Sequence, residues 1–178
     1  AHRYATFHDF DGSGSRVASA VGLTCLDVWG HDEDPGVAQL AEYRGIALQL
    51  TNILRDVAED ATRDRIYLPQ EDLERFGVTE PELLAGEPTE RLERLMQYQI
   101  ERTRSYYEMS ATLERHISAD CRATSWVMTQ TYRRLLERIA RDPLAVLRRR
   151  VRLPSLTKLA IAARGAWRRN WTPAGQHA

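Results

Sequence analysis

The chain has 178 residues, of which 43% are hydrophobic and 28% are charged, and its 25 basic and 25 acidic side chains cancel to a formal net charge of zero. This length and balance indicate one globular domain, or part of one, with room for a buried core. No apolar run is long enough to cross a bilayer and the start of the chain has no signal-peptide pattern, so we expect neither a membrane-spanning segment nor a secreted protein.

The predicted elements are all helical, because apolar side chains recur at helical spacing and no alternating strand pattern runs for more than a few residues. In chain order the helices are predicted over 16–29, 37–60, 70–76, 89–117, 119–141 and 154–168. Gly30 closes the first helix and Gly77 the third. Pro81, Gly86 and Pro88 break up the segment between the third and fourth helices.

These elements predict a single all-α domain over residues 1–178, built as a helical bundle with short connections. Residues 62–69 are predicted as a loop, and residues 170–178 as a frayed tail. The two cysteines, Cys25 and Cys121, are too few and too far apart for a disulfide framework or a zinc site. We expect both to be small buried side chains in a reducing cytoplasm.

The predicted helix over 37–60, VAQLAEYRGIALQLTNILRDVAED, carries one polar line on an otherwise apolar surface. At about 100° per residue, the members of this line fall within about 60° of Asp56. They are Gly45, Gln49, Asn52, Asp56, Glu59 and Asp60. Asp56 and Asp60, four residues apart, repel each other unless a cation lies between them.

Such a pair of carboxylates suits Mg²⁺, which commonly joins protein carboxylates to substrate phosphates and keeps water in its remaining positions. Arg55, next to the acids, is the side chain best shaped to hold a diphosphate. The alternative interpretation is a solvated helix end whose acids are placed by chance.

The run over 45–78, GIALQLTNILRDVAEDATRDRIYLPQEDLERFGV, resembles the second acidic signature of the squalene/phytoene synthase family. The matching positions are Gln49, Asn52, Arg55, Asp56, Glu59, Asp60, Arg65, Tyr67, Leu68 and Pro69. The resemblance continues through RVASAVG at 16–22 and VRLPSLTKLAIAARG at 151–165. It implies the helical bundle of an isoprenoid synthase and a Mg²⁺-dependent transferase that joins two prenyl diphosphates head to head.

The resemblance also implies roles for individual residues. The implied catalytic residues are Arg55, Arg65 and Tyr67, and the implied metal ligands are Asp56, Asp60 and, second in rank, Glu59. The implied substrate-binding residues are Gln49, Asn52, Gly45, Tyr132, Ala18, Val21 and Gly22. Other interpretations stay open: a buried polar pair at Gln49 and Asn52, a helix-packing role for Gly45, and a packed core position for Tyr67.

Two departures from the family pattern affect what the chain is expected to do. The family's other acidic motif, on an early helix, has no counterpart, because Asp32 and Asp34 lie in a Pro-Gly turn and Asp9 and Asp11 precede a glycine. At Ser13 the family usually has a tyrosine tied to proton and cation handling. We therefore expect the C-terminal two-thirds of a family member, with the N-terminal helices missing.

The leading hypothesis is a bacterial transferase that acts on farnesyl or geranylgeranyl diphosphate in hopanoid or carotenoid biosynthesis. The runs over 52–69 and 151–165 slightly favour the presqualene branch over the phytoene branch. NADPH is implied only if the squalene-forming second step is carried out. The rival hypothesis is a truncated or degenerate, non-catalytic member that binds diphosphate or acts as a partner subunit.

The last part of the chain is strongly basic, with twelve basic and two acidic side chains over 133–170. A solvated basic face is one interpretation. Peripheral contact with an anionic membrane is another, which a substrate with a lipid tail would favour. Binding of nucleic acid has the least support. The expected partner is therefore a prenyl diphosphate, with no nucleic acid, for a protein of the cytoplasm. Peripheral contact with the inner face of a membrane stays open as the alternative to a solvated basic face.

Overall fold

The computed structural model describes residues 3–9 and 15–170, with side chains described for 3–9 and 22–168. Its elements, in chain order, are α1 (Phe7–Asp9), α2 (Ser15–Trp29), α3 (Val37–Ala61), α4 (Gln70–Phe76), α5 (Glu80–Ala85), α6 (Glu90–Met109), α7 (Leu113–His116), α8 (Ala119–Ala140), the 3-10 turn η2 (Pro143–Leu147) and α9 (Ser155–Asn170). Over the described ranges the only strand-like pairing is an isolated bridge between His31 and Ile117. The all-α prediction is confirmed. None of the described helices is both long and apolar enough to cross a membrane.

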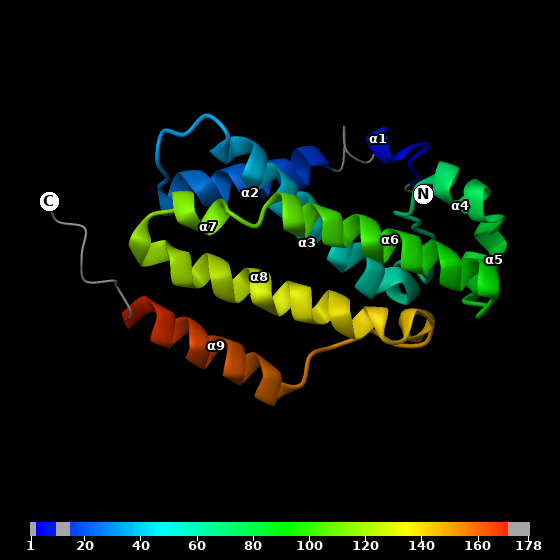
Figure 1. The fold of residues 1–178 in the computed structure, drawn as a ribbon. Helices are drawn as coiled ribbons and strands as arrows, with labels where there is room; N and C mark the ends of the chain where they lie inside the picture. Colours follow the sequence, from blue (N-terminus) through cyan, green and yellow to red (C-terminus); the bar gives the residue numbers. More distant parts are fainter. Residues whose placement is uncertain (1–2, 10–14, 171–178) are drawn as a thin grey trace, which may run out of the picture.

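Helix α3 lies at the centre of the bundle (Figure 1). It packs against α2, α6 and α8, and α9 lies on α8 at the edge of the bundle opposite α2. The buried positions of α3 run nearly its whole length, from Val37 to Val57. A helix that is apolar on most sides is stable only when neighbours enclose it, which explains its central place.

The long helix predicted over 89–117 is two helices. α6 ends at Met109 and the chain resumes as the short helix α7 at Leu113, although apolar positions stay buried on both sides of the break, from Leu92 to Ile117. At the break, the backbone carbonyl of Ser110 accepts hydrogen bonds from the Leu113 backbone N–H at 3.1 Å and from Arg44 Nη2 at 2.7 Å. Because Arg44 lies on α3, the apolar spacing of 89–117 carries no sign of this break.

Helix α5 lies in the segment 78–88, for which the sequence predicts no helix. The Thr79 hydroxyl accepts from the Glu82 backbone N–H while the Glu82 carboxylate accepts from the Thr79 backbone N–H, which is a capping box. Pro81 lies in the first turn, where no N–H is needed, and Gly86 ends the helix with a φ of 68°. The proline and glycine thus mark the two ends of a short helix.

Two predictions fall at the limits of the described chain. Asn170, predicted as the start of the frayed tail, is the last residue of α9, and 171–178 lie outside the described residues. Ser13, where the family pattern has a tyrosine, also lies outside them. Cys25 and Cys121 are free, but both are half-buried rather than buried as predicted.

Helices α2 and α3 approach each other closely at Gly22. A Cβ atom there would lie 2.6 Å from the backbone carbonyl oxygen of Ala41 and 3.7 Å from Gly45 Cα. A backbone atom cannot move aside as a flexible side chain does, so we expect Gly22→Ala to lower the free energy of unfolding by about 1–3 kcal/mol. Urea unfolding measures this change, with Thr24→Ala on the exposed face of α2 as the control. Equal stability of the two variants would contradict the close crossing.

A buried ion pair joins α3, α7 and α8. Arg44 is 4% exposed, and its Nη1 lies 2.6 Å from Glu114 Oε1. Its Nε donates to the Ser110 hydroxyl at 2.9 Å, and Nη1 also donates to the hydroxyl of Thr129. With the Ser110 carbonyl and Glu114 Oε2, every guanidinium N–H has an acceptor. Burial acts to raise the pKa of Glu114, but hydrogen bonding and the charge of Arg44 outweigh it and hold that pKa below its ordinary value.

Candidate active site

The carboxylate of Asp56, near the C-terminal end of α3, is held by two guanidinium groups. Arg55 Nε donates to Asp56 Oδ1 at 2.7 Å, and Arg150 Nε lies 2.8 Å from the same oxygen. Arg150 comes from the segment after η2, 94 residues further along the chain. The side chains of Arg55 and Asp56 are each 18% exposed. Partial burial weakens screening by water, so the charges of this cluster interact strongly.

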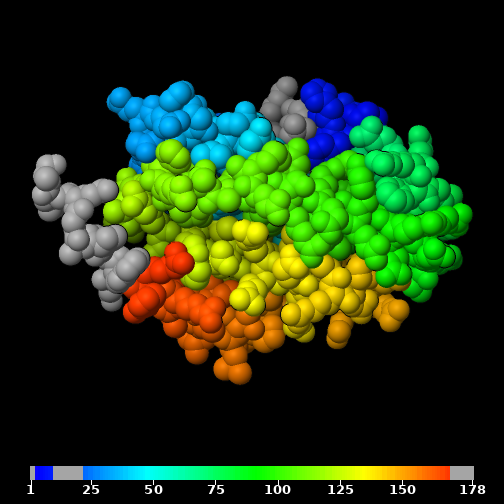
Figure 2. All heavy atoms as spheres, in the orientation of Figure 1, coloured from blue at the N-terminus to red at the C-terminus, as the bar shows by residue number. Residues whose placement is uncertain are grey.

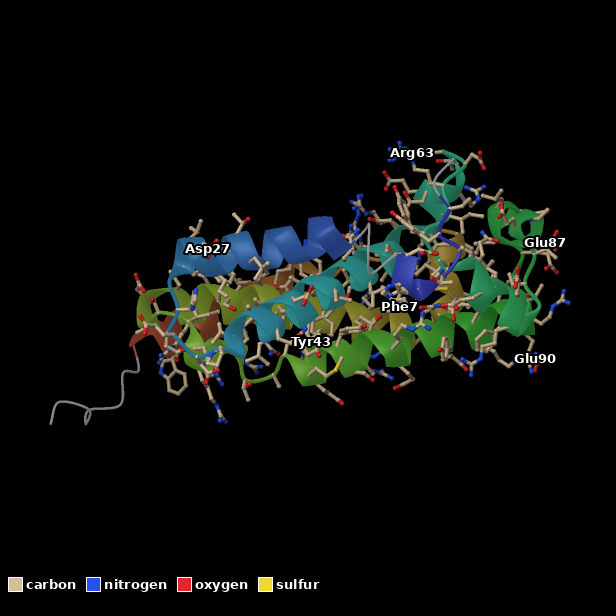
Figure 3. All side chains as sticks on the ribbon, turned by 90° about the horizontal axis from the view of Figure 1, so that it is seen from above. Phe7, Asp27, Tyr43, Arg63, Glu87 and Glu90 are labelled. Carbon is tan, nitrogen blue, oxygen red and sulfur yellow. The ribbon has the colours of Figure 1, made fainter. Side chains whose placement is uncertain are left out.

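Glu59 lies on the more exposed side of the same cluster. Its side chain is 39% exposed and pairs with Arg63 at 3.1 Å and more loosely with Arg150 at 3.6 Å. Figure 3 shows Arg63 at the turn beyond the end of α3, pointing away from the bundle. Arg150 thus links the carboxylates of Asp56 and Glu59.

Asp60 has a different environment from Asp56. Burial, followed by the negative charges of Asp56 and Glu59, raises the pKa of Asp60 against a smaller opposing effect of Arg65 and Arg63. A raised carboxyl pKa means that the folded protein disfavours the charged form. Asp60 is therefore the acid of this helix that a bound cation would relieve.

The residues of the polar line are compatible with Mg²⁺. The described side chains include no group of three or more His, Cys, Asp or Glu residues placed to hold a metal ion. Mg²⁺ does not need such a group, because it usually keeps several waters and binds one or two protein carboxylates together with substrate phosphates. Asp56 and Asp60 supply two carboxylates on one face of α3, and burial together with the charges of Asp56 and Glu59 raises the pKa of Asp60, an effect that a bound cation would oppose. This donor set fits a Mg²⁺ ion held jointly by protein and ligand.

A largely apolar cavity of about 190 Å³ lies next to the charged cluster. Its lining residues are Gly22, Cys25, Leu26, Trp29, Ala41, Arg44, Gly45, Leu48, Gln49, Asn52, Leu113, Ile117, Met128 and Tyr132. Five of the seven predicted substrate-binding residues belong to this lining. The side chains of the other two, Ala18 and Val21, lie outside the described residues.

Asn52 marks the polar end of the cavity. Its Oδ1 is buried and has no hydrogen-bond partner among the described residues, a situation that costs about 1–3 kcal/mol unless a ligand or water supplies a donor. Asn52 lies one turn before Asp56 on α3. Tyr132 also lines the cavity and interacts with Arg55. The pKa of Arg55 is raised mainly by hydrogen bonding to Asp56 and to a smaller extent by Tyr132. The polar end of the cavity therefore meets the charged cluster.

The loop after α3 places Arg65 and Tyr67 apart from this cavity. Both line a second, much smaller hollow of about 10 Å³, together with Asp60. Tyr67 also packs against Tyr4, with ring centroids 6.3 Å apart. The structure therefore groups Arg65 and Tyr67 with the acidic end of the polar line and not with Gln49 and Asn52.

The sequence model of the squalene/phytoene synthase family matches residues 1–157 of this chain. The chain belongs to the squalene/phytoene synthase family. Its curated relatives include the 15-cis-phytoene synthases of Synechococcus elongatus and Synechocystis, each 40% identical, over 169 and 168 residues. The alignments cover 89% and 88% of this chain but 55% and 50% of the relatives. The chain thus spans about half the length of the curated relatives it matches.

Solved structures of this family have the same fold. A dehydrosqualene synthase in complex with ligand matches with a TM-score of 0.80 and 27% identity, over 96% of this chain and 60% of that one. The squalene synthase HpnC from Alicyclobacillus acidocaldarius matches with a TM-score of 0.74 and 26% identity, over 80% of this chain and 54% of that one. The predicted family and the isoprenoid synthase bundle are confirmed.

Sequence reasoning misses Arg150, which joins the charged cluster at Asp56. It stands third in a run of three arginines at 148–150, inside a segment that is basic throughout. Composition therefore cannot distinguish it from its neighbours. It is singled out by the packing of η2 on α3, which brings the end of this run to Asp56.

Neutralising Asp60 is expected to stabilise this family member in the absence of metal. Because the folded state raises the pKa of Asp60, stability falls as the pH rises through the folded pKa. Asp60→Asn removes this loss and relieves a like-charge repulsion of about 0.5 kcal/mol. Thermal unfolding in EDTA at neutral pH should therefore give a higher midpoint for Asp60→Asn than for the unmodified chain. The difference should vanish below the ordinary carboxyl pKa, where both states are protonated.

Asp56→Asn is the comparison for this measurement. It removes one member of the ion pairs with Arg55 and Arg150, so we expect it to lower the midpoint. The helical spacing alone makes the two acids equivalent, whereas their surroundings predict opposite signs. A lower midpoint for Asp60→Asn would show that its carboxylate is structural.

Proposed function

We propose that this chain supplies a diphosphate-binding helix and prenyl cavity of a Mg²⁺-dependent transferase that joins two prenyl diphosphates head to head. The observation that carries the proposal is the unpartnered Oδ1 of Asn52, at the junction of an apolar cavity and the cluster of Asp56, Arg55 and Arg150. An apolar cavity suits a hydrocarbon chain and paired guanidinium groups suit a diphosphate. Family membership supports the same class of reaction.

The proposed role of Arg55 and Arg150 is to bind the diphosphate. Asp56 holds both guanidinium groups, so their N–H donors are oriented before the ligand arrives. Donors fixed in this way also stabilise the negative charge that the diphosphate gains as it departs. Arg65 and Tyr67, beside Asp60, are proposed to contact the diphosphate from the loop after α3.

Asp56 and Asp60 are the proposed ligands of Mg²⁺. When bound, the ion neutralises diphosphate oxygens and so assists departure of the leaving group. Glu59 is placed second because it lies about 60° from Asp56 around the helix, and its side chain is 39% exposed.

The prenyl chain is proposed to lie in the cavity, with Gln49, Asn52 and Tyr132 at its diphosphate end. Breaking the allylic carbon–oxygen bond leaves a carbocation, to which the double bond of the second prenyl diphosphate adds. Water would trap that cation, so the apolar lining protects it. Gly22 and Gly45 keep the crossing of α2 and α3 free of side chains and thereby leave room for the prenyl chain.

Farnesyl and geranylgeranyl diphosphate are the proposed substrates. The named relatives include phytoene synthases, and the solved neighbours include a dehydrosqualene synthase and a squalene synthase. Carotenoid and hopanoid routes are therefore both proposed, and the presqualene branch stays a prediction. NADPH is required only if a reductive second step to squalene is catalysed. We place the protein in the cytoplasm, with peripheral membrane contact through its basic C-terminal part.

Product formation from labelled farnesyl and geranylgeranyl diphosphate with Mg²⁺ tests the proposal. The 178-residue chain carries one helical acid pair instead of the two that the family pattern has. We therefore expect turnover at least roughly 10²-fold below that of a full-length relative, because each lost charge-stabilising group costs about that factor. The alignment leaves part of the Synechococcus elongatus relative uncovered. Fusing that part to this chain should restore product formation.

Two outcomes would overturn this account. Ready product formation by the chain alone would show that a second acidic pair is unnecessary. A folded fusion that binds diphosphate without forming product would favour a non-catalytic family member, in which Ser13 stands where the family usually has a tyrosine. The fusion with Asp56→Asn is the inactive control.

A further inference from the structure

The outward face of α9 is apolar. Leu156, Leu159 and Trp167 are 80%, 67% and 68% exposed. Ala160 and Ala163 are also exposed, and at about 100° per residue all five lie within about 60° of Leu156. We call these five residues the α9 stripe. Single exposed apolar residues are ordinary, but a continuous stripe along one helix is typical of a contact surface.

The opposite face of α9 is packed on α8 and fixes the direction in which the stripe points. Ile161 is 6% exposed, and Gly165 has no room for a Cβ atom because it would overlap Val127. The guanidinium of Arg168 lies 4.6 Å from the centre of the Trp126 ring. Because rolling α9 would break these contacts, the stripe stays outward. Figures 1 and 2 show α9 along the lower edge of the molecule, remote from α2.

A basic hollow of about 430 Å³ borders the N-terminal end of the stripe. Besides Arg104 of α6, its lining residues come from the last turns of α8, the residue after it and the start of α9: Arg134, Arg138, Ala140, Arg141, Leu153, Pro154 and Thr157. Glu137 also lines it, but Arg104 binds this carboxylate at 2.6 Å. Within the described residues, Arg134, Arg138 and Arg141 have no carboxylate at ion-pair distance. The hollow therefore holds uncompensated positive charge beside an exposed apolar stripe.

We propose that the α9 stripe and the basic hollow form one docking surface for a bilayer that contains anionic phospholipid. The inference rests on the proposed membrane contact and locates it. The leucines and Trp167 enter the boundary between headgroups and acyl chains, and Arg134, Arg138 and Arg141 bind a lipid phosphate. A helix lying in the membrane surface combines these two features, an apolar face and a basic flank.

Two other occupants fit this surface less well. Nucleic acid would satisfy the arginines but would leave Leu156 and Leu159 in water, because its backbone offers no apolar surface of comparable size. A second copy of the chain, paired through a two-fold axis that crosses the stripe, would set the two α9 helices antiparallel. Each basic hollow would then lie near the C-terminal end of the other α9, which carries the exposed Arg164 and Arg168, and like charges would repel.

Flotation of the 178-residue chain with vesicles tests the proposal without prenyl diphosphate or Mg²⁺, so its outcome is independent of catalysis. The chain should float with vesicles of phosphatidylcholine plus phosphatidylglycerol, and added salt should weaken binding. Leu156→Ser with Leu159→Ser should weaken vesicle affinity about tenfold. Arg134→Ser, Arg138→Ser and Arg141→Ser together should weaken it about a hundredfold.

Matched control variants distinguish binding through this surface from binding that depends only on the total number of exposed apolar or basic side chains. Leu23→Ser with Val28→Ser removes apolar side chains that are 37% and 76% exposed on α2, and should leave vesicle binding unchanged. The arginine control replaces three exposed residues elsewhere, Arg91, Arg94 and Arg115, with serine. Circular dichroism and thermal melts confirm that each variant is folded.

Several results would overturn the proposal. The folded chain could fail to float with the anionic vesicles. It could bind equally well to vesicles of phosphatidylcholine alone. The control variants could lose as much vesicle affinity as the variants of the proposed surface. RNA binding that depends on the arginines but not on the leucines would assign the hollow to nucleic acid. A dimer that the leucine variant dissociates, with no change in flotation, would assign the stripe to self-association.

Discussion

Replacing either partner of the Arg55–Asp56 pair should weaken binding of a prenyl diphosphate by about a hundredfold or more. In the proposed site, Arg55 contributes charged N–H donors to the diphosphate, and Asp56 both orients that guanidinium and offers its carboxylate to Mg²⁺. Loss of one preorganised group of this kind costs roughly 3 kcal/mol. Calorimetric titration of Arg55→Met and Asp56→Asn with an unreactive farnesyl diphosphate analogue, in the presence of Mg²⁺, measures the effect.

Two further arginines provide comparisons for this titration. Arg150→Met should cost about tenfold, because the side chain of Arg150 is 41% exposed, against 18% for Arg55, so water screens its charge more. Arg63→Met should change affinity little, since its side chain is 55% exposed and pairs only with Glu59 among the described carboxylates. Equal losses for Arg63→Met and Arg55→Met would mean that the diphosphate binds elsewhere.

Arg44→Met should destabilise the fold by about 3–5 kcal/mol. The substitution leaves the Glu114 carboxylate without its cation and removes the donor that holds the Ser110 carbonyl at the break between α6 and α7. Removing one partner of a buried ion pair has a penalty of this size, because the remaining charge stays buried. Urea unfolding measures the change, with Arg104→Met, which breaks a surface pair, as the control.

The double variant Arg44→Met with Glu114→Met separates the effect of charge on stability from the effect of packing. Replacing both charges by apolar side chains should recover much of the lost stability. Because the pKa of Glu114 is held below its ordinary value of 4.5, the contribution of the pair is complete above that value and is lost as the pH falls through the folded pKa. An Arg44→Met variant as stable as the unmodified chain would contradict this role.

The sequence predicts the central helix and its polar line, because both depend on the spacing of residues within one helix. Asn52 and Asp56 lie at one end of the cavity because α3 is regular from Val37 to Ala61. Cavity lining by Gly45, Gln49 and Tyr132 also agrees with the family resemblance. Which of these residues bind metal or substrate stays a prediction.

Features that depend on contacts between distant segments are not predictable in this way. Arg150 reaches Asp56 only because η2 folds back on α3, and nothing local distinguishes it from Arg148 and Arg149. The break after Met109 has the same origin, since Arg44 on another helix donates to the Ser110 carbonyl. Apolar periodicity reports burial, and burial continues across this break.

The measurement that tests the central claim most directly is the thermal midpoint of the chain with the unreactive farnesyl diphosphate analogue, with and without Mg²⁺. A ligand that binds only the folded state raises the midpoint in proportion to the logarithm of its concentration over its dissociation constant. We predict a rise that requires both the analogue and Mg²⁺, that farnesol does not produce, and that Asp56→Asn abolishes. A rise of the same size in EDTA, or one that Asp56→Asn leaves unchanged, would contradict a Mg²⁺–diphosphate site on α3.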